Sequence, residues 1–395
     1  MFTEKIPMNR DNPAIKYHLK SRGKIETSLK SPLRSAEDLS LAYTPGVAEV
    51  CRTIAAEPET VETLTNRGNT VAIVTDGTAI LGLGDIGPSA GLPVMEGKAM
   101  LFKKTADVDA VPLCISANGT EDVVRFCKQI EPSFGGINLE DIAAPECFEI
   151  LERLENELSI PVFHDDQDGT AIVVTAALIN ASKVRGSDIT SLRAVINGSG
   201  AAGIAIARLL ISKGVEDVVL VDSKGILNLE RADLNDSKRE IASRSNPRAL
   251  SGNLATALSN ADVFIGVSKG NILDRDDIRT MAERPIVFAM ANPEPEILPD
   301  EATAGGAFIV GTGRSDFPNQ INNALVFPGL FRGLLDARAA DSSRSVSKVT
   351  DSLKLAVANA LAGTVEPTVD RILPAVMDPS VVPAVRTAVL AWNAS

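Results

Sequence analysis

The chain has 395 residues, 45% of them hydrophobic, which is long enough for two or three domains with sizeable cores. Its net charge of −12 argues against nucleic-acid or anionic-membrane partners, which both require basic patches. No apolar run approaches the roughly 18–20 residues of a membrane-spanning helix. The N-terminus lacks the apolar core of a secretory signal, and the four cysteines show no paired spacing. These features predict a cytoplasmic protein.

The first half of the chain begins with a polar, basic arm over residues 1–40, in which we expect short helices. A strand over 70–74, the Asp76-Gly77 turn and an apolar run over 79–84 together predict a hairpin. Continuous apolar runs predict further buried strands, and helical periodicity predicts two helices. The strands are expected over 110–115 and 161–163, and the helices over 121–130 and 145–158.

A long apolar helix that begins at Gly169 is the best candidate for a domain boundary. We therefore expect an N-terminal domain over 1–168 and a second domain over 169–325. The pattern is helical in the last segment, 326–395, which we expect to pack on both preceding domains.

The second domain opens with a glycine fingerprint. A buried strand over 192–197 leads into the fingerprint, a helix follows, and a strand over 218–221 ends in Asp222, about 20 residues past the last glycine. Such glycines let the backbone approach a pyrophosphate at a helix N-terminus. The pattern predicts an α/β domain with a Rossmann-type, doubly wound parallel sheet that binds a dinucleotide; a glycine-rich turn in an ordinary α/β fold is the alternative. The fingerprint residues are Gly198, Ser199, Gly200, Ala201, Ala202 and Gly203, and later buried strands are expected over 262–266, 285–289 and 308–311.

Two acidic pairs, Glu140-Asp141 and Asp165-Asp166, follow apolar segments within a short stretch. Two unit charges about 4 Å apart repel by roughly 4 kcal/mol at an effective dielectric of 20, so clustered carboxylates favour a bound cation. Oxygen ligands suit Mg²⁺ or Mn²⁺. The alternative is that both pairs are solvated loops and that Asp168 caps the following helix. We interpret His164 as a packing residue, because a lone histidine is more often that than a ligand.

Lys98 and Tyr43 are candidate proton-transfer residues. Lys98 lies in an apolar segment, where burial would lower its pKa toward the range that a base for alcohol oxidation needs. The alternative is a surface lysine with a buried stem. Tyr43 stands beside the Pro45-Gly46 turn and is one of only two tyrosines; an ordinary surface or core aromatic is its alternative.

Together these segments resemble the short bacterial malic enzymes over nearly the whole chain. The likeness is carried by several motifs in the right order: the segments over 24–27 and 39–48, the glycine-rich segment over 76–87, the lysine motif over 95–98, the acidic segments over 138–142 and 163–167, and the asparagine segments over 291–293 and 319–329.

The resemblance implies a fold with an N-terminal α/β catalytic domain, a Rossmann-type domain and C-terminal helices. It also implies oxidative decarboxylation of L-malate to pyruvate and CO₂, with reduction of NAD(P) and a divalent Mg²⁺ or Mn²⁺ ion. Tyr43 falls on the family's general acid and Lys98 on its general base. The remaining matches are Glu140, Asp141 and Asp166 on the metal ligands, Asp165 on the neighbouring acid, and Asn292 and Asn323, with Lys98, on residues that contact substrate or nicotinamide.

Two positions depart from the family pattern: Ala79 stands where long members have a substrate-binding arginine, and Asp168 where short members commonly have histidine. Asp222 alone would favour NAD through the ribose hydroxyl, but Ser223 and Lys224 offer a hydroxyl and a cation for a 2′-phosphate. The resemblance with this charge pattern favours NADP.

The resemblance also implies a homodimer or a larger homo-oligomer, in which the N-terminal arm can bring Tyr43 to a neighbouring subunit. A malolactic enzyme, which makes lactate at the same kind of site, is the alternative activity. A dinucleotide sensor without catalysis is the alternative from another class, but such a sensor would not need Lys98, Tyr43 and three carboxylates.

Overall fold

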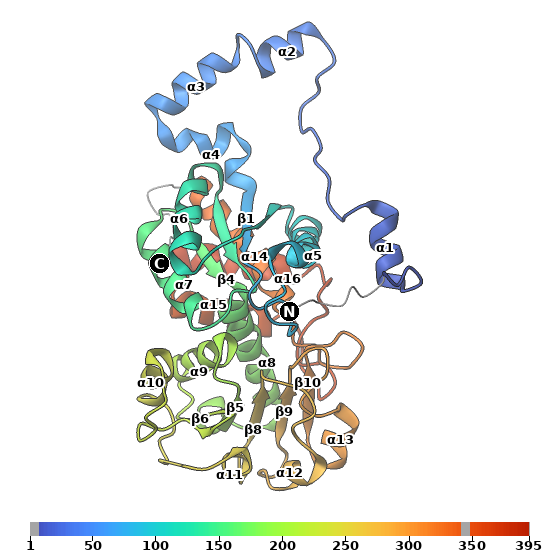
Figure 1. The fold of residues 1–395 in the computed structure, drawn as a ribbon, viewed down its shortest axis with the longest axis vertical. Helices are drawn as coiled ribbons and strands as arrows, with labels where there is room; N and C mark the ends of the chain where they lie inside the picture. The colour runs from blue at the N-terminus through green and yellow to red at the C-terminus, as the bar shows by residue number, and fades with distance from the viewer. Residues whose placement is uncertain (1–7, 341–347, 395) are drawn as a thin grey trace.

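Two β-sheets that follow one another along the chain form the framework of the protein (Figure 1). The computed structural model describes residues 8–340 and 348–394. The strands are β1 Thr70–Thr75, β2 Asp109–Cys114, β3 Gly136–Leu139, β4 Val162–His164, β5 Arg193–Asn197, β6 Asp217–Asp222, β7 Gly225–Ile226, β8 Val263–Gly266, β9 Ile286–Ala289 and β10 Ile309–Thr312. The α-helices are α1 Pro13–Ser21, α2 Ala36–Ala42, α3 Val47–Ala56, α4 Val61–Leu64, α5 Pro88–Ala106, α6 Thr120–Ile130, α7 Glu146–Glu157, α8 Thr170–Arg185, α9 Ala201–Lys213, α10 Asp236–Ala242, α11 Leu254–Leu258, α12 Arg275–Arg279, α13 Pro299–Ala304, α14 Phe327–Ala340, α15 Asp351–Ala362 and α16 Val381–Ala394.

The first sheet has the strand order β2-β1-β3-β4, and all its strands are parallel. Helices cover both faces, so the central strand β1 is buried along its whole length, and the four residues between its terminal threonines are all apolar. On one face Val74 and Leu139 pack with apolar residues of α6 and α7. On the other face α5, α8 and α14 meet the sheet, with Phe102 and Phe163 both in edge contact with Phe331.

The second sheet has the order β10-β9-β8-β5-β6-β7, in which only β7 runs antiparallel to its neighbour. Side chains of β5 alternate between two cores: Ile196 packs in the core shared with α8 and α9, and Val195 in the core shared with α11 to α13. The expected α/β class with a doubly wound parallel sheet is confirmed.

The predicted hairpin over 70–84 is wrong. Thr70–Thr75 pairs in parallel with β2 and β3, not with the segment that follows it. The run over 79–84 is a loop closed by one isolated bridge between Ile80 and Gly84, and its Leu83 is exposed. A local pattern of apolar residues around a turn cannot distinguish a hairpin from a strand whose partners lie far along the chain.

The C-terminal helices connect both halves of the molecule. Arg338 of α14 donates from Nε to Glu62 Oε1 at 2.7 Å, beside the start of the first sheet. Helix α15 packs against α8 and α9, at the side of the second sheet. The segment after residue 326 therefore contacts both sheets.

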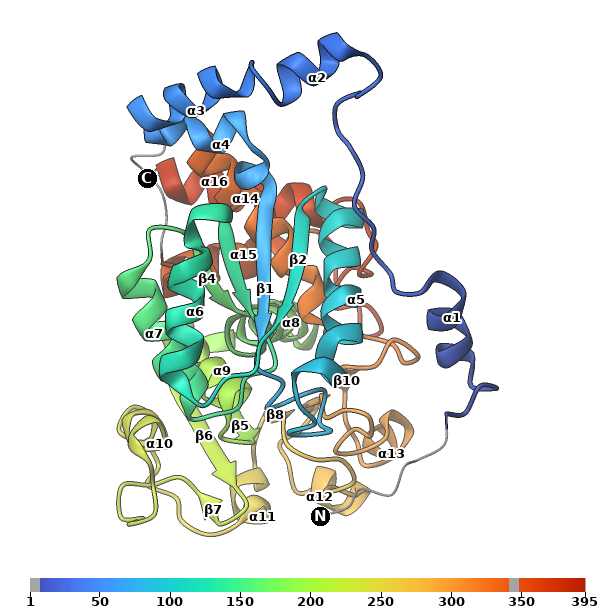
Figure 2. The same ribbon diagram turned by 45° about the horizontal axis from the view of Figure 1, so that its top comes forward.

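The N-terminal arm leaves this body, and Figure 2 shows α2 and α3 lying beyond the end of the first sheet, with α1 to one side. No residue of α1, α2 or α3 is buried. Lys30 holds the connecting segment by donating to Asp109 Oδ2 at 3.0 Å. In the part of the chain that the structure describes, no helix combines the length and apolar character needed to cross a membrane.

Candidate active site

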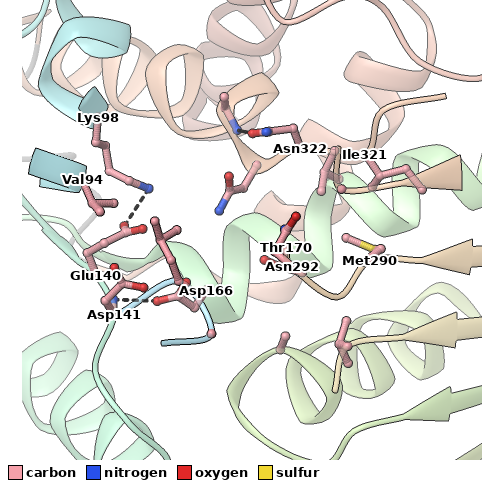
Figure 3. Close-up of a pocket in the computed structure, with 18 of the residues that line it drawn as sticks. Val94, Lys98, Glu140, Asp141, Asp166, Thr170, Met290, Asn292, Ile321 and Asn322 are labelled. Atoms are coloured by element: carbon pink, nitrogen blue, oxygen red, sulfur yellow. Dashed lines mark hydrogen bonds and ion pairs between the residues drawn. The ribbon is translucent and has the colours of Figure 1, made fainter. Parts of the chain in front are cut away.

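A cavity of about 510 Å³ lies where the two sheets meet (Figure 3). Its walls include residues that directly follow strands of both sheets. Because parallel strands bring their carboxyl ends to one edge, residues far apart in sequence converge there. These residues are Glu140 and Asp141 after β3, Asp166 after β4, Val267 and Ser268 after β8, Met290 after β9 and Gly313 after β10.

Three carboxylates form a cluster on the wall that the first sheet supplies. Glu140, Asp141 and Asp166 each offer an oxygen, and these oxygens lie within 4.8 Å of one another. The three residues lie just past the ends of the neighbouring strands β3 and β4, and the Asp141 backbone N–H donates to Asp166 Oδ2 at 2.8 Å. Asn138, whose role the sequence did not reveal, donates from Nδ2 to Glu140 Oε2 at 3.0 Å.

The electrostatics of this cluster fit a cation. Burial, and then the charge of Asp166, raise the pKa of Asp141 to about 7. Burial likewise raises the pKa of Glu140, and Lys98 only partly offsets this. Asp141 Oδ2 is buried and has no hydrogen-bond partner among the described residues. An all-oxygen donor set with an unpartnered buried oxygen suits Mg²⁺ or Mn²⁺, which Glu140, Asp141 and Asp166 would hold.

Lys98 reaches the cluster from α5. Its side chain is buried, and Nζ lies 2.6 Å from Glu140 Oε2 and 4.3 Å from the centre of the Phe327 ring. Nζ also donates to Asp165 Oδ2. Burial lowers the pKa of Lys98, but the charges of Asp165 and Glu140 outweigh burial and hold the pKa above its ordinary value. The expected lowering of this pKa is therefore wrong for this arrangement.

Asp165 lies behind the cavity wall and is fully buried. Burial raises its pKa to about 6 although Lys98 opposes the shift, and its Oδ1 has no partner among the described residues. His164 is also fully buried, and burial lowers its pKa although Asp166 and Asp168 oppose the shift. Its Nδ1 lies 3.8 Å from Asp166 Oδ2, outside the carboxylate cluster.

Asp168 does not cap a helix, so that interpretation is wrong. The helix that follows has Gly169 at its N-cap position and no side-chain cap. Asp168 ends up buried in the π-helical turn Asp165–Gly169, where its Oδ1 lies 2.6 Å from Lys354 Nζ of α15. A partner almost 190 residues away cannot be read from the local sequence.

The glycine fingerprint joins β5 to α9 as predicted. A side chain at Gly203 would meet the Gly198 carbonyl oxygen at 1.7 Å, so strand and helix pack too closely for any other residue. Gly200, in contrast, faces open space, since nothing lies within 4 Å of where its Cβ would be. The turn thus leaves room for a phosphate at the start of a 13-residue helix, and Ala202 of this turn lines the cavity.

Asp222 ends β6 and lies beside a separate open cavity of about 770 Å³, which Ser223 also lines. Arg231 donates to both Asp222 oxygens, at 2.8 and 3.1 Å, and Lys238 donates to Oδ2 at 2.7 Å. Burial alone would raise the pKa of Asp222, but these hydrogen bonds outweigh it and lower the pKa to about 2. No motif spacing pointed to Arg231 or Lys238.

The predicted asparagines, Asn292 and Asn323, both line the main cavity, as does Asn322, which the sequence did not single out. Ala79 lines it too. Among the described residues of this cavity wall, Lys98 is the only cation. Asn292 lies at a contact between the two halves, because a side chain at Gly82 would meet its backbone oxygen at 2.7 Å.

Tyr43, a predicted site residue, lies on a different part of the molecule from these two cavities. It ends α2 on the N-terminal arm, and 65% of it is exposed. In Figure 1 the arm that carries it extends from the far end of the first sheet. Within one chain the structure does not bring Tyr43 to Lys98.

Two family models together match most of the chain. The model described as "Malic enzyme, N-terminal domain" matches residues 22–155, and "Malic enzyme, NAD binding domain" matches residues 167–390. A relative from Bacillus subtilis named "Bifunctional malic/malolactic enzyme" is 51% identical over 97% of this chain and 92% of its own length. A relative from Geobacillus stearothermophilus named "NAD-dependent malic enzyme" is 50% identical, over 93% of this chain and 76% of its own. A relative from Halomonas elongata named "NADP-dependent malic enzyme" is 46% identical, over 88% of this chain and 81% of its own length.

Solved structures give the same likeness in three dimensions. The crystal structure of NAD-dependent malic enzyme from Thermotoga maritima superposes with a TM-score of 0.90 at 51% identity, covering 95% of this chain and 98% of that one. The crystal structure of malic enzyme from Pyrococcus horikoshii gives a TM-score of 0.90 at 45% identity, covering 96% of this chain and 90% of that one.

Proposed function

The chain belongs to the malic enzyme family, and on that premise we propose that it converts L-malate to pyruvate and CO₂ while reducing NAD(P). One observation carries the proposal. Lys98 and three carboxylates lie in the same cavity as residues that follow the strands of the dinucleotide-binding sheet. A proton acceptor, a cation site and a hydride acceptor are the three components that alcohol oxidation followed by decarboxylation requires.

The proposed roles follow from what each side chain contacts. A divalent cation held by Glu140, Asp141 and Asp166 would polarise the C2 oxygen of malate and stabilise negative charge on it. Bound dinucleotide would accept the hydride from C2. Lys98 takes the proton of the C2 hydroxyl, which requires its neutral form. Glu140 helps to keep Lys98 protonated. A cation that neutralised the Glu140 carboxylate would therefore favour loss of a proton from the Lys98 ammonium group.

Asp165 acts as a positioning residue in this proposal. It is buried behind Lys98 and accepts a hydrogen bond from Nζ, which fixes the ammonium over the Phe327 ring. Asn292 and Asn323 offer amide groups to the substrate or the nicotinamide ring. Ala79 leaves no arginine among the described residues of this wall, so these amides are candidate groups for binding the distal carboxylate.

We propose that Tyr43 of the partner subunit returns a proton to C3, within a homodimer or larger assembly. Tyr43 is exposed on an arm without a single buried helical residue, and the apolar side chains of Leu29 and Leu41 are 78% and 71% exposed. An arm of this kind gains burial only against another molecule. A second copy that receives it would also receive the phenol.

NADP is the proposed preferred cofactor. Asp222 would repel a 2′-phosphate if its charge were free, but Arg231 and Lys238 both pair with it. Arg231 and Lys224 also pair with Asp233, so three cations face two carboxylates here. Arg231 and Lys238 occupy the Asp222 carboxylate, which would otherwise accept the ribose hydroxyls of NAD. Comparing kcat/KM for NADP and NAD tests this preference.

A spectrophotometric assay at 340 nm, with malate, Mn²⁺ and each dinucleotide in turn, tests the activity itself. We expect NAD(P)H to accumulate, EDTA to abolish the rate, and Mn²⁺ or Mg²⁺ to restore it. Full activity of chelator-treated, metal-free protein would refute the role of the three carboxylates.

A malolactic reaction is the second candidate, because the Bacillus subtilis relative carries both activities in its name. Lactate formation without net accumulation of NADH would identify it. Pyruvate formation in proportion to NAD(P)H identifies oxidative decarboxylation.

A further inference from the structure

A second cavity, of about 370 Å³, shares the turn that carries the metal-site carboxylate Asp166. Asp166 lines the candidate active site, whereas Gln167 and Asp168 line this second cavity. Residues of α7 from the first half of the chain and of α9, α10 and α15 from the second half complete its wall. Figure 1 shows α7, α9 and α15 gathered where the two sheets meet.

The inner wall carries more negative than positive charge. Asp168 is only 3% exposed; its Oδ1 is paired with Lys354, but its Oδ2 is buried and has no hydrogen-bond partner among the described residues. Glu155 of α7 also lines the cavity, and burial followed by the charge of Asp168 raises the pKa of Glu155 to about 7. Asp168 is thus a buried carboxylate with one oxygen paired to Lys354 and the other without a partner, and Glu155 is a half-buried carboxylate on the same wall. A buried acceptor without a partner is costly.

Apolar side chains form much of the remaining lining, together with two cations, the acids Glu152 and Asp351, and the polar residues Gln167, Ser237 and Thr350. Lys348, which precedes α15, is exposed, and Arg208 of α9 is already paired with Glu240 at 2.9 Å. The apolar part of the wall consists of Phe148, Leu151, Ala171, Ala205, Leu209 and Val349. The cavity therefore combines an acceptor for an ammonium group, a cation for a carboxylate and an apolar surface.

We propose that this cavity binds a small α-amino acid with an apolar side chain. The ammonium group donates to Asp168 Oδ2 and to Glu155, the carboxylate faces Lys348, and the side chain lies on Leu151 and Ala205. The volume, about 370 Å³, is ample for a molecule of this size. The site is distinct from the malate site and does not depend on the proposed reaction.

Isothermal titration calorimetry on the full-length protein tests the proposal, with L-valine as the probe. Isobutylamine lacks the carboxylate of valine, and 3-methylbutanoate lacks its ammonium group. We expect one valine per chain and at least tenfold weaker binding of either analogue. No binding of valine, or equal binding of isobutylamine, would overturn the assignment, the latter because it would mark a simple cation site.

Two variants locate the binding. Glu155→Gln removes a carboxylate that faces the ammonium group, and Lys348→Ala removes the cation at the edge; each should weaken valine binding at least tenfold. Glu149→Gln is the matched control, since Glu149 lies on the same helix as Glu155 but outside the cavity wall. Unchanged affinity in both cavity variants would refute the site. Because the heat of binding is measured without turnover, failure here leaves the malate reaction untouched, and an inactive protein that binds valine leaves this site standing.

Discussion

Mixing two inactive variants tests whether the arm serves a neighbouring subunit. Lys98→Ala removes the proposed base, and Tyr43→Phe removes the proposed acid; each should lower kcat at least about a hundredfold. The structure separates the two groups within one chain, because Lys98 is buried in the cavity and Tyr43 is exposed on the arm. If arms are exchanged between subunits, a mixed dimer regains one complete site, which combines Lys98 of one chain with Tyr43 of the other.

The expected recovery follows from counting. Random association of equal amounts of the two variants makes half of the dimers mixed, and each mixed dimer has one complete site of two, so activity should return to about one quarter of wild type. If Tyr43 acts within its own chain, no dimer has a complete site and the mixture stays near the residual rate. That residual rate, measured in a mixture shown to contain mixed dimers by two affinity tags, would refute the exchange.

A matched control uses the double variant with wild type. If arms are exchanged, a mixed dimer has no complete site, so only the wild-type dimers are active and the equal mixture retains about one quarter of the activity. If Tyr43 acts within its own chain, each mixed dimer keeps one complete site and the mixture retains about one half. Arm exchange raises the activity of the first mixture above the value for action within one chain, and lowers the activity of the second mixture below it. A general loss of activity caused by the mixing procedure therefore cannot produce both results.

Three predictions concern single side chains. Lys98→Ala should lower kcat by at least about a hundredfold with a smaller change in malate KM, and near-normal turnover would remove Lys98 from its role. Lys238→Ala should lower kcat/KM for NADP about tenfold, because it removes a cation that neutralises Asp222, and should not lower kcat/KM for NAD; an equal loss with both cofactors would contradict this role of Lys238. Burial raises the folded-state pKa of Glu155 from 4.5 to about 7, so wild-type stability falls as pH rises through that window. Glu155→Gln should therefore raise Tm by about 2–4 °C at pH 8 and change it little at pH 5, and a pH-independent difference would count against that pKa.

Continuous apolar runs and the glycine fingerprint could be predicted from the sequence because their causes are local. Strands buried on both faces, such as Ile286–Ala289, must be apolar throughout, and only glycine fits where Gly203 meets Gly198. Strand β3 was not among the predicted strands; it has only four residues and begins at the second of two glycines, Gly135 and Gly136. In the structure these glycines admit α14, since a side chain at Gly136 would meet the Phe331 ring at 2.8 Å.

The parts of the site that could not be predicted depend on partners distant in sequence. Burial suggested a lowered pKa for Lys98, but the acid that accepts its hydrogen bond lies 67 residues away. Arg231 and Lys238 follow no spacing rule, although their contacts with Asp222 bear directly on cofactor preference. Local sequence gives the type of a functional group, whereas its protonation depends on which other charges the fold brings beside it.

The acidic cluster and Lys98 form one electrostatic unit, and this explains why a base can be built from a lysine whose pKa is raised. Asp165 and Glu140 hold Lys98 protonated. Burial raises the pKa of both carboxyl groups, and the charge of Lys98 offsets this only in part. A divalent cation on Glu140, Asp141 and Asp166 would remove part of the negative potential at Nζ and lower the Lys98 pKa. By linkage, deprotonation of Lys98 must then strengthen cation binding. Above the pH range in which Glu140 and Asp141 lose their own protons, apparent Mn²⁺ affinity should consequently keep rising with pH in wild type and level off in Lys98→Ala. Parallel pH profiles in that range would show that the lysine and the cation site titrate independently.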